Sequence, residues 1–143
     1  MTIPVGAARP LRGWLTANAL FSGASGAVII AASGTIPSLI GAGGRVLYVM
    51  LGALLCLYGM RLWWLSRRPL DAGEVRVIVG ADVFWVLGSV TVMAAGMLTP
   101  VGDLIVGTVG AAVGVFAVGQ AASLRRQLQS GVPAPVESSR PTT

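Results

Sequence analysis

The sequence contains no histidine, no lysine and a single cysteine, Cys56. Without histidine there is no histidine-ligated haem, no Ser-His-Asp triad and no Cys-His dyad. One cysteine cannot form an intrachain disulfide, and no cluster of Cys and His is available to bind zinc. We therefore expect no catalytic residues, no metal site and no cofactor, and we do not expect an enzyme.

Charged residues are also scarce. They make up 10% of the 143 residues, whereas 55% of the residues are hydrophobic; soluble domains contain about 25% charged residues. Hydrophobic runs of about 20 residues recur, and each is long enough to cross a bilayer core of about 30 Å as a helix. Strands would show polar alternation, and a barrel would need more of them. The sequence predicts an all-α integral membrane protein, a four-helix bundle.

The four predicted membrane spans are 13–33, 46–65, 75–97 and 104–124. They form a transmembrane domain over residues 11–128, preceded by an N-terminal segment, 1–10. The tail, 129–143, is rich in Pro, Ser and Thr and is predicted to be disordered. Gly and Pro separate the spans, and Asp103 is a candidate N-cap of the fourth. Ile40, between the first two spans, suggests that this loop dips partly into the membrane interface.

The ten basic residues, all arginine, lie mostly beside the spans and at one end of the predicted bundle. Under the positive-inside rule both termini are cytoplasmic (N-in, C-in). Although the formal net charge is +5, a nucleic-acid-binding protein would gather its basic residues on one face of a soluble domain. We therefore expect no nucleic acid among its partners. An alternative for the first span is a cleaved signal peptide, because small residues at 31–33 follow an apolar stretch flanked by arginine.

Each span also contains one buried polar residue, five or six residues from an arginine that flanks the same span. Six helical residues cover about 9 Å, so these side chains reach one level in the cytoplasmic half of the membrane. The predicted polar layer consists of Asn18, Arg61, Asp82 and Gln120, with Tyr58 one turn deeper.

A carboxylate near the bilayer centre costs about 2.5–3.5 kcal/mol on insertion scales, so Asp82 is not expected to face lipid. We expect it to face the bundle interior and to pair with Arg61, while Asn18 and Gln120 satisfy its remaining lone pairs. In the alternative, Arg61 extends to the headgroups. The whole layer could also be purely structural.

Helical spacing continues this polar face outward along the first and third spans. The predicted pocket wall comprises Trp14, Ser22, Ser25, Trp85 and Ser89. In the alternative, the serines only permit close packing, with hydroxyls bonded to their own helices. Small residues also line one face of the fourth span, including Gly107, Gly110 and Gly114. This face predicts tight packing, either within the bundle or in a homodimer.

The segments LTANALFSGASG and GADVFWVLGS make residues 11–126 resemble small four-span inner-membrane proteins of bacteria. That resemblance implies a multi-pass protein of the bacterial inner membrane and no particular activity. Small multidrug resistance transporters are similar in size. They place an essential Glu in the first helix, where this chain has Asn18 and carries its membrane acid in the third.

Three functions are consistent with these features. The first is a non-enzymatic accessory or scaffold module, which would act within a homo-oligomer or a larger membrane complex. The second is a small oligomeric transporter or channel, proton-coupled through Asp82. The third is a site for a lipid or quinone-type ligand, open to the cytoplasmic leaflet between Trp14, Trp85 and Asn18. Membrane lipids are expected partners in every case.

Overall fold

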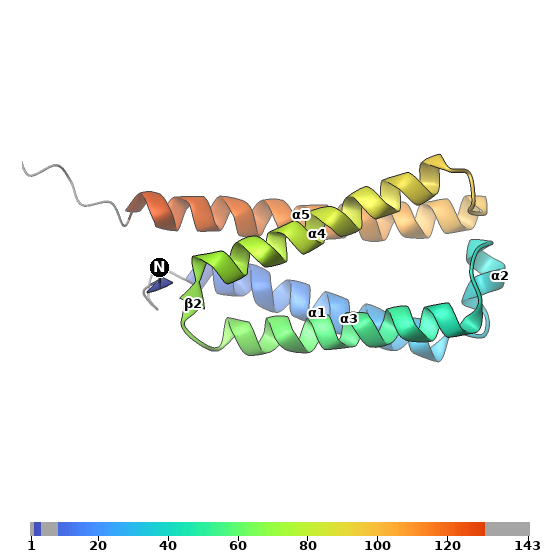
Figure 1. Ribbon diagram of the computed structural model, residues 1–143, viewed down its shortest axis with the longest axis horizontal. Coiled ribbons are helices and arrows are strands. Elements are labelled where there is room, and N and C mark those ends of the chain that lie inside the picture. Colours follow the sequence, from blue (N-terminus) through green and yellow to red (C-terminus); the bar gives the residue numbers. More distant parts are fainter. Residues whose placement is uncertain (1, 4–8, 131–143) are drawn as a thin grey trace, which may run out of the picture.

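The computed structural model describes residues 2–3 and 9–130, and this part of the chain is almost entirely helical. Its helices are α1 (Arg9–Ala31), α2 (Ile36–Ile40), α3 (Arg45–Ser66), α4 (Ala72–Ala94) and α5 (Pro100–Ser130). Two short strands, β1 (Thr2–Ile3) and β2 (Leu70–Asp71), pair antiparallel. The predicted fold class, an all-α four-helix bundle, is confirmed (Figure 1).

Each predicted span falls on one long helix, and the differences are at the ends. Helix α1 begins inside the predicted segment 1–10, and α5 continues to Ser130, beyond the predicted start of the tail. The rest of the tail, 131–143, lies outside the described residues, as do residues 1 and 4–8. The short helix α2 lies where a loop was predicted between the first two spans.

The surface of the bundle is strongly apolar. Four helices are long and apolar enough to cross a membrane. Large apolar side chains point away from the bundle, among them Phe84, Val46 and Leu104, which are 78%, 72% and 71% exposed. Monomeric soluble proteins rarely expose apolar surface this extensively. By length and composition, the chain is a multi-pass membrane protein.

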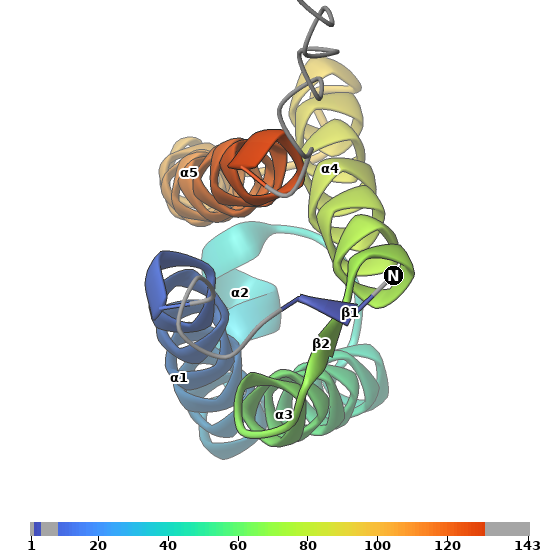
Figure 2. The same cartoon turned by 90° about the vertical axis from the view of Figure 1, so that its left-hand side faces the viewer.

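The four long helices are arranged as two pairs. Helix α1 packs along α3, α4 packs along α5, and a smaller contact joins α1 to α5. Helices α3 and α4 lie close together near β2 and diverge toward the α2 end, as Figures 1 and 2 both show. The bundle is therefore closed at the β2 end and splayed at the other.

Glycines allow α1 and α3 to approach very closely. A Cβ atom on Gly52 would lie 2.7 Å from the carbonyl oxygen of Gly26, and one on Gly59 would lie 2.8 Å from that of Ala19. Real Cβ atoms do not approach backbone oxygens so closely, so any larger residue would force the helices apart. Small residues at helix contacts serve this purpose in membranes, where no hydrophobic effect drives helices together.

The glycines predicted to mediate packing in the fourth span lie against α4. Cβ atoms on Gly107 and Gly110 would each lie 3.3 Å from a side-chain atom, of Met93 and Ser89 respectively. One on Gly114 would lie 3.8 Å from the side chain of Val86. The structure thus uses this face inside the bundle, which was one of the two alternatives. Its contacts are looser than those between α1 and α3.

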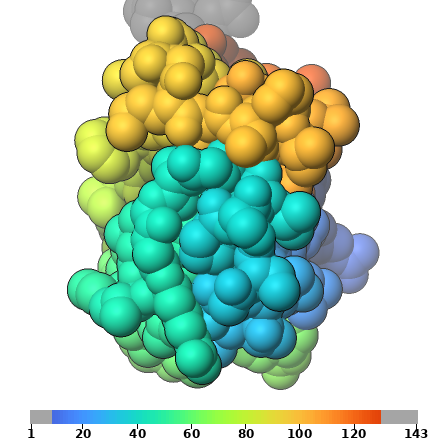
Figure 3. All heavy atoms as spheres, turned by 90° about the vertical axis from the view of Figure 1, so that its right-hand side faces the viewer, coloured from blue at the N-terminus to red at the C-terminus, as the bar shows by residue number. Residues whose placement is uncertain are grey.

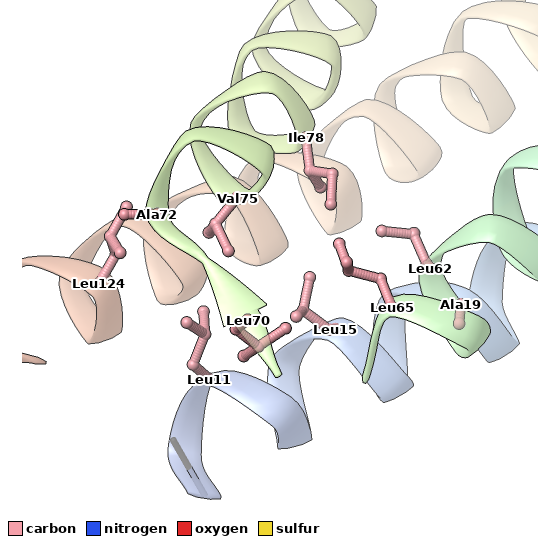
Figure 4. Packing of buried hydrophobic residues seen from close by; sticks show 10 residues of the cluster. All are labelled: Leu11, Leu15, Ala19, Leu62, Leu65, Leu70, Ala72, Val75, Ile78 and Leu124. Atoms are coloured by element: carbon pink, nitrogen blue, oxygen red, sulfur yellow. The ribbon is translucent and has the colours of Figure 1, made fainter. Parts of the chain in front are cut away.

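The hydrophobic core is concentrated at the β2 end, where the helices converge (Figure 4). Leucines from α1, α3, β2 and α5 meet there with residues of α4. Its buried members are Leu11, Leu15, Ala19, Leu62, Leu65, Leu70, Ala72, Val75, Ile78 and Leu124. This end therefore has the tightest packing between the two helix pairs.

Polar side chains secure the backbone at the same end. The carboxylate of Asp71 caps α4 by accepting a hydrogen bond from the Gly73 amide at 2.8 Å. The guanidinium of Arg12 donates to the carbonyl oxygens of Ser66, the last residue of α3, and of Arg68, two residues beyond it. Arg12 therefore satisfies carbonyl groups that the end of a helix leaves without a partner.

At the opposite end, α2 is held against the connection between α4 and α5, and Figure 3 shows the two in contact on that face. The Thr99 hydroxyl donates to the carbonyl of Leu39, and the Thr99 amide donates to that of Ile40 at 2.8 Å. The same hydroxyl accepts from the Gly102 amide at 3.0 Å, so Thr99 caps α5 in place of the predicted Asp103. Gly41, at φ 88°, makes the turn that ends α2.

Replacing Thr99 with valine is expected to lower the free energy of unfolding by about 1 kcal/mol, because α5 loses its cap and α2 loses one tie. Thermal unfolding in detergent micelles would measure the effect. Thr108→Val is the matched control, since that hydroxyl is exposed and bonds only to its own helix, at Leu104. Equal unfolding temperatures for the two variants would contradict the assignment.

Candidate functional site

Asp82 lies close to the middle of α4, one turn beyond the core residue Ile78, and is 2% exposed. Its carboxylate accepts three hydrogen bonds. One oxygen accepts from the Tyr58 hydroxyl at 2.9 Å. The other accepts from the side-chain amides of Asn18 at 2.8 Å and Gln120 at 3.3 Å. The donors come from α1, α3 and α5, so all four long helices contribute one residue to this polar cluster.

Most of the polar cluster is buried, and Tyr58 is its only partly exposed member. Asn18 and Gln120 are both 0% exposed. The Ser22 hydroxyl donates to the amide oxygen of Asn18 at 3.1 Å, which orients the Asn18 amide group toward Asp82. Hydrogen bonds to a carboxylate are stronger than those between neutral groups, and they compensate for its removal from water. These hydrogen bonds thus accommodate an acid within an apolar bundle.

Arg61 does not belong to the polar cluster, and the predicted Arg61–Asp82 ion pair is corrected. Among residues 9–130 the hydrogen-bond partners of Asp82 are Asn18, Tyr58 and Gln120, and the Arg61 side chain is exposed. Arg61 lies almost one turn beyond Tyr58, nearer the end of α3, and it is the Tyr58 hydroxyl that reaches the carboxylate. The long side chain of Arg61 faces outward, which is the direction needed for the alternative prediction that it extends to the headgroups.

A cavity of about 290 Å³ adjoins the polar cluster on the side where α4 diverges from α3. All four long helices contribute to its walls. The lining residues are Phe21, Ser22, Ser25, Ile29, Leu54, Leu55, Tyr58, Ala81, Asp82, Trp85, Val109 and Val113. Its size is near the lower limit for small-molecule sites, about 300 Å³. The walls are mainly apolar, with Asp82 and Tyr58 on the side of the polar cluster.

The predicted pocket wall is correct in part. Ser22, Ser25 and Trp85 line the cavity, whereas Trp14 and Ser89 do not. The Trp14 ring packs edge-on against Phe116, with centroids 6.4 Å apart, and the Ser89 hydroxyl donates to the Trp85 carbonyl at 3.0 Å. The predicted ligand site between Trp14, Trp85 and Asn18 is therefore not formed, because of these three residues only Trp85 lines the cavity. The apolar lining residues were missed because nothing distinguishes them in a sequence this apolar.

The remaining reactive side chain, Cys56, is engaged in packing between α1 and α3. Its thiol donates to the carbonyl of Gly23 at 3.7 Å and lies against Gly26. Across the described part of the chain, His, Cys, Asp and Glu form no group of three that could hold a metal ion. The distinctive chemistry of this region is the carboxylate of Asp82 beside an apolar cavity.

The fold and the polar cluster define a class: a multi-pass helical membrane protein with a buried, hydrogen-bonded acid. No family model, no curated protein and no solved structure matches the sequence, so comparison with known proteins does not narrow this class further.

Proposed function

We propose that this protein is a non-enzymatic membrane module, an accessory or scaffold subunit whose helices are held in register by the polar cluster around Asp82. The supporting observation is that the carboxylate is hydrogen-bonded by one residue from each of the other three long helices. Any sliding or rotation of one helix would break at least one of these bonds and leave a polar group unpaired in an apolar interior. Such a cluster gives a small bundle one defined shape to present to a homo-oligomer or a larger complex.

We place the protein in a bacterial inner membrane with both termini in the cytoplasm. In the antiparallel bundle, Arg9 at the start of α1, Arg68 after α3 and Arg125 in α5 belong to the same end. Arg45, at the start of α3, belongs to the opposite end. This asymmetry supports the orientation through the positive-inside rule. The resemblance to small bacterial four-span proteins supports the choice of membrane.

The second candidate function is transport or binding of a small, mainly apolar molecule, with Asp82 as the proton-linked group. The cavity beside Asp82 favours it, because ligand sites in helical bundles are built between helices from apolar walls and a few polar groups. Ionisable residues within membrane spans also often mark substrate or proton pathways. Four helices enclose little volume, so this function would require an oligomer.

Asp82→Asn separates the two candidates when purified wild type and variant are compared in lipid nanodiscs across pH. If the protein is a structural module, the variant should unfold at a lower temperature than wild type, and neither protein should release a ligand. If it is a transporter, the variant should be about as stable as wild type but should have lost a bound molecule or a pH-dependent flux. The readouts are thermal unfolding and mass spectrometry of bound small molecules.

Asp103→Asn is the control for this comparison, because it removes an acid in the first turn of α5, outside the polar cluster. It is expected to match wild type in both readouts. The structural proposal is contradicted if Asp82→Asn matches it too in stability.

A further inference from the structure

A second hollow, of about 290 Å³, lies between α4 and α5 toward the β2 end of the bundle. It shares no lining residue with the cavity beside Asp82. Two arginines and four apolar residues form it: Arg76, Val79, Ala121, Leu124, Arg125 and Leu128. We call it the α4–α5 groove. It combines a cationic rim with an apolar floor, a combination that the proposed function does not use.

No acid within the described residues forms an ion pair with the two arginines of the groove. Arg76 and Arg125 are both exposed, and within residues 9–130 neither forms an ion pair. Glu74, two residues before Arg76, is paired with Arg68 of the connection between α3 and α4. Asp82 is enclosed by its own three donors. An anion entering the groove would therefore meet two guanidinium groups that are not paired with any acid of the described part of the chain.

We propose that the α4–α5 groove binds an anionic phospholipid, with its phosphate between Arg76 and Arg125 and an acyl chain along the floor. Guanidinium groups bind phosphate oxygens with two parallel hydrogen bonds, and basic pockets between membrane helices bind anionic headgroups. The floor of Val79, Leu124 and Leu128 offers an apolar surface that a soluble phosphate cannot use. The charge at the rim also disfavours a second copy of this chain, which would bring two further arginines.

The first experiment measures lipid binding to the full chain in detergent by native mass spectrometry. Phosphatidylglycerol and phosphatidylcholine with identical acyl chains are the probes. We expect wild type to retain phosphatidylglycerol preferentially. Each arginine near a membrane surface contributes about 1 kcal/mol to attraction of anionic lipid, so Arg76→Gln with Arg125→Gln should weaken binding about 10- to 30-fold.

The matched control is Arg9→Gln with Arg67→Gln. It removes two exposed arginines from the same end of the bundle, outside the groove. We expect it to weaken binding less than about threefold. Equal losses in the two double variants would mean that the whole basic end attracts lipid diffusely, and would overturn the site. Absence of a headgroup preference in wild type would overturn it as well.

A second pair of variants tests the floor while all arginines remain. Ala121 lines the groove and is half-buried, whereas its neighbour Ala122 is exposed and does not line it. We expect Ala121→Phe to reduce retention of phosphatidylglycerol and Ala122→Phe to leave it unchanged. Glycerol phosphate, the headgroup chemistry without acyl chains, should fail to displace the lipid. Displacement by glycerol phosphate, or equal retention by the two phenylalanine variants, would show that no acyl chain occupies the groove.

Discussion

Replacing Gly52 with leucine is expected to destabilise the protein by about 3 kcal/mol or more, the upper range for overpacked sites. A Cβ atom there would lie 2.7 Å from the carbonyl oxygen of Gly26 and 2.6 Å from a side-chain carbon of Ile30. The backbone of α1 cannot move aside without separating from α3 along its length. The measurement is thermal unfolding in detergent micelles, with the fraction of folded protein recovered after extraction as a second readout.

Gly80→Leu is the matched control, because a Cβ at Gly80 would meet nothing within 4 Å. Leucine favours helix over glycine by somewhat less than about 1 kcal/mol, so this variant should be as stable as wild type or slightly more stable. The close contact of α1 and α3 would be refuted if the two leucine variants unfolded at the same temperature.

Replacing Asp82 with alanine is expected to lower the free energy of unfolding by about 2–4 kcal/mol. The change leaves three donors, on Asn18, Tyr58 and Gln120, without their acceptor. A buried group left unpaired costs about 1–3 kcal/mol, although single hydrogen bonds in membrane proteins average about 0.6 kcal/mol. Tyr58→Phe, which removes one donor only, should cost less, about 1 kcal/mol.

A double-mutant cycle tests whether these residues act as one cluster. Asp82→Ala should cost less in a Tyr58→Phe background than in wild type, with a coupling energy of about 0.6–1.7 kcal/mol. Tyr48→Phe is the control background, since the Tyr48 hydroxyl donates to the Ala42 carbonyl at 2.6 Å and shares no partner with Asp82. Strict additivity with Tyr58→Phe would mean that the hydrogen bond contributes nothing to stability.

Along its axis the bundle has three zones with different physical properties. An apolar core joins the two helix pairs at the β2 end, the polar cluster follows, and the cavity lies beyond it where α3 and α4 diverge. The polar cluster is thus a point at which side chains of all four long helices meet, between the apolar core and the cavity. At this position Asp82 is hydrogen-bonded to the other three long helices and also lines the cavity.

The four apolar helices and the positions of the polar residues along them follow from the amino-acid sequence. A hydrophobic run of about 20 residues crosses lipid as a helix, because a helix satisfies all its backbone polar groups internally. The fixed rise per residue then gives the depth of each polar side chain relative to the flanking arginines. Asn18, Asp82 and Gln120 could therefore be expected at one level. The scarcity of other polar groups made their proximity easier to foresee.

The direction in which each side chain faces depends instead on how the helices pack against one another. Depth alone placed Arg61 near Asp82, but the rotation of α3 about its axis brings Tyr58 to the carboxylate and turns Arg61 outward. That rotation is set by the contact of α1 with α3 at Gly26, Gly52 and Gly59, which a glycine-rich sequence does not single out. The same packing leaves Trp14 against α5 and creates the cavity, because these outcomes depend on how helices distant in the sequence fit together.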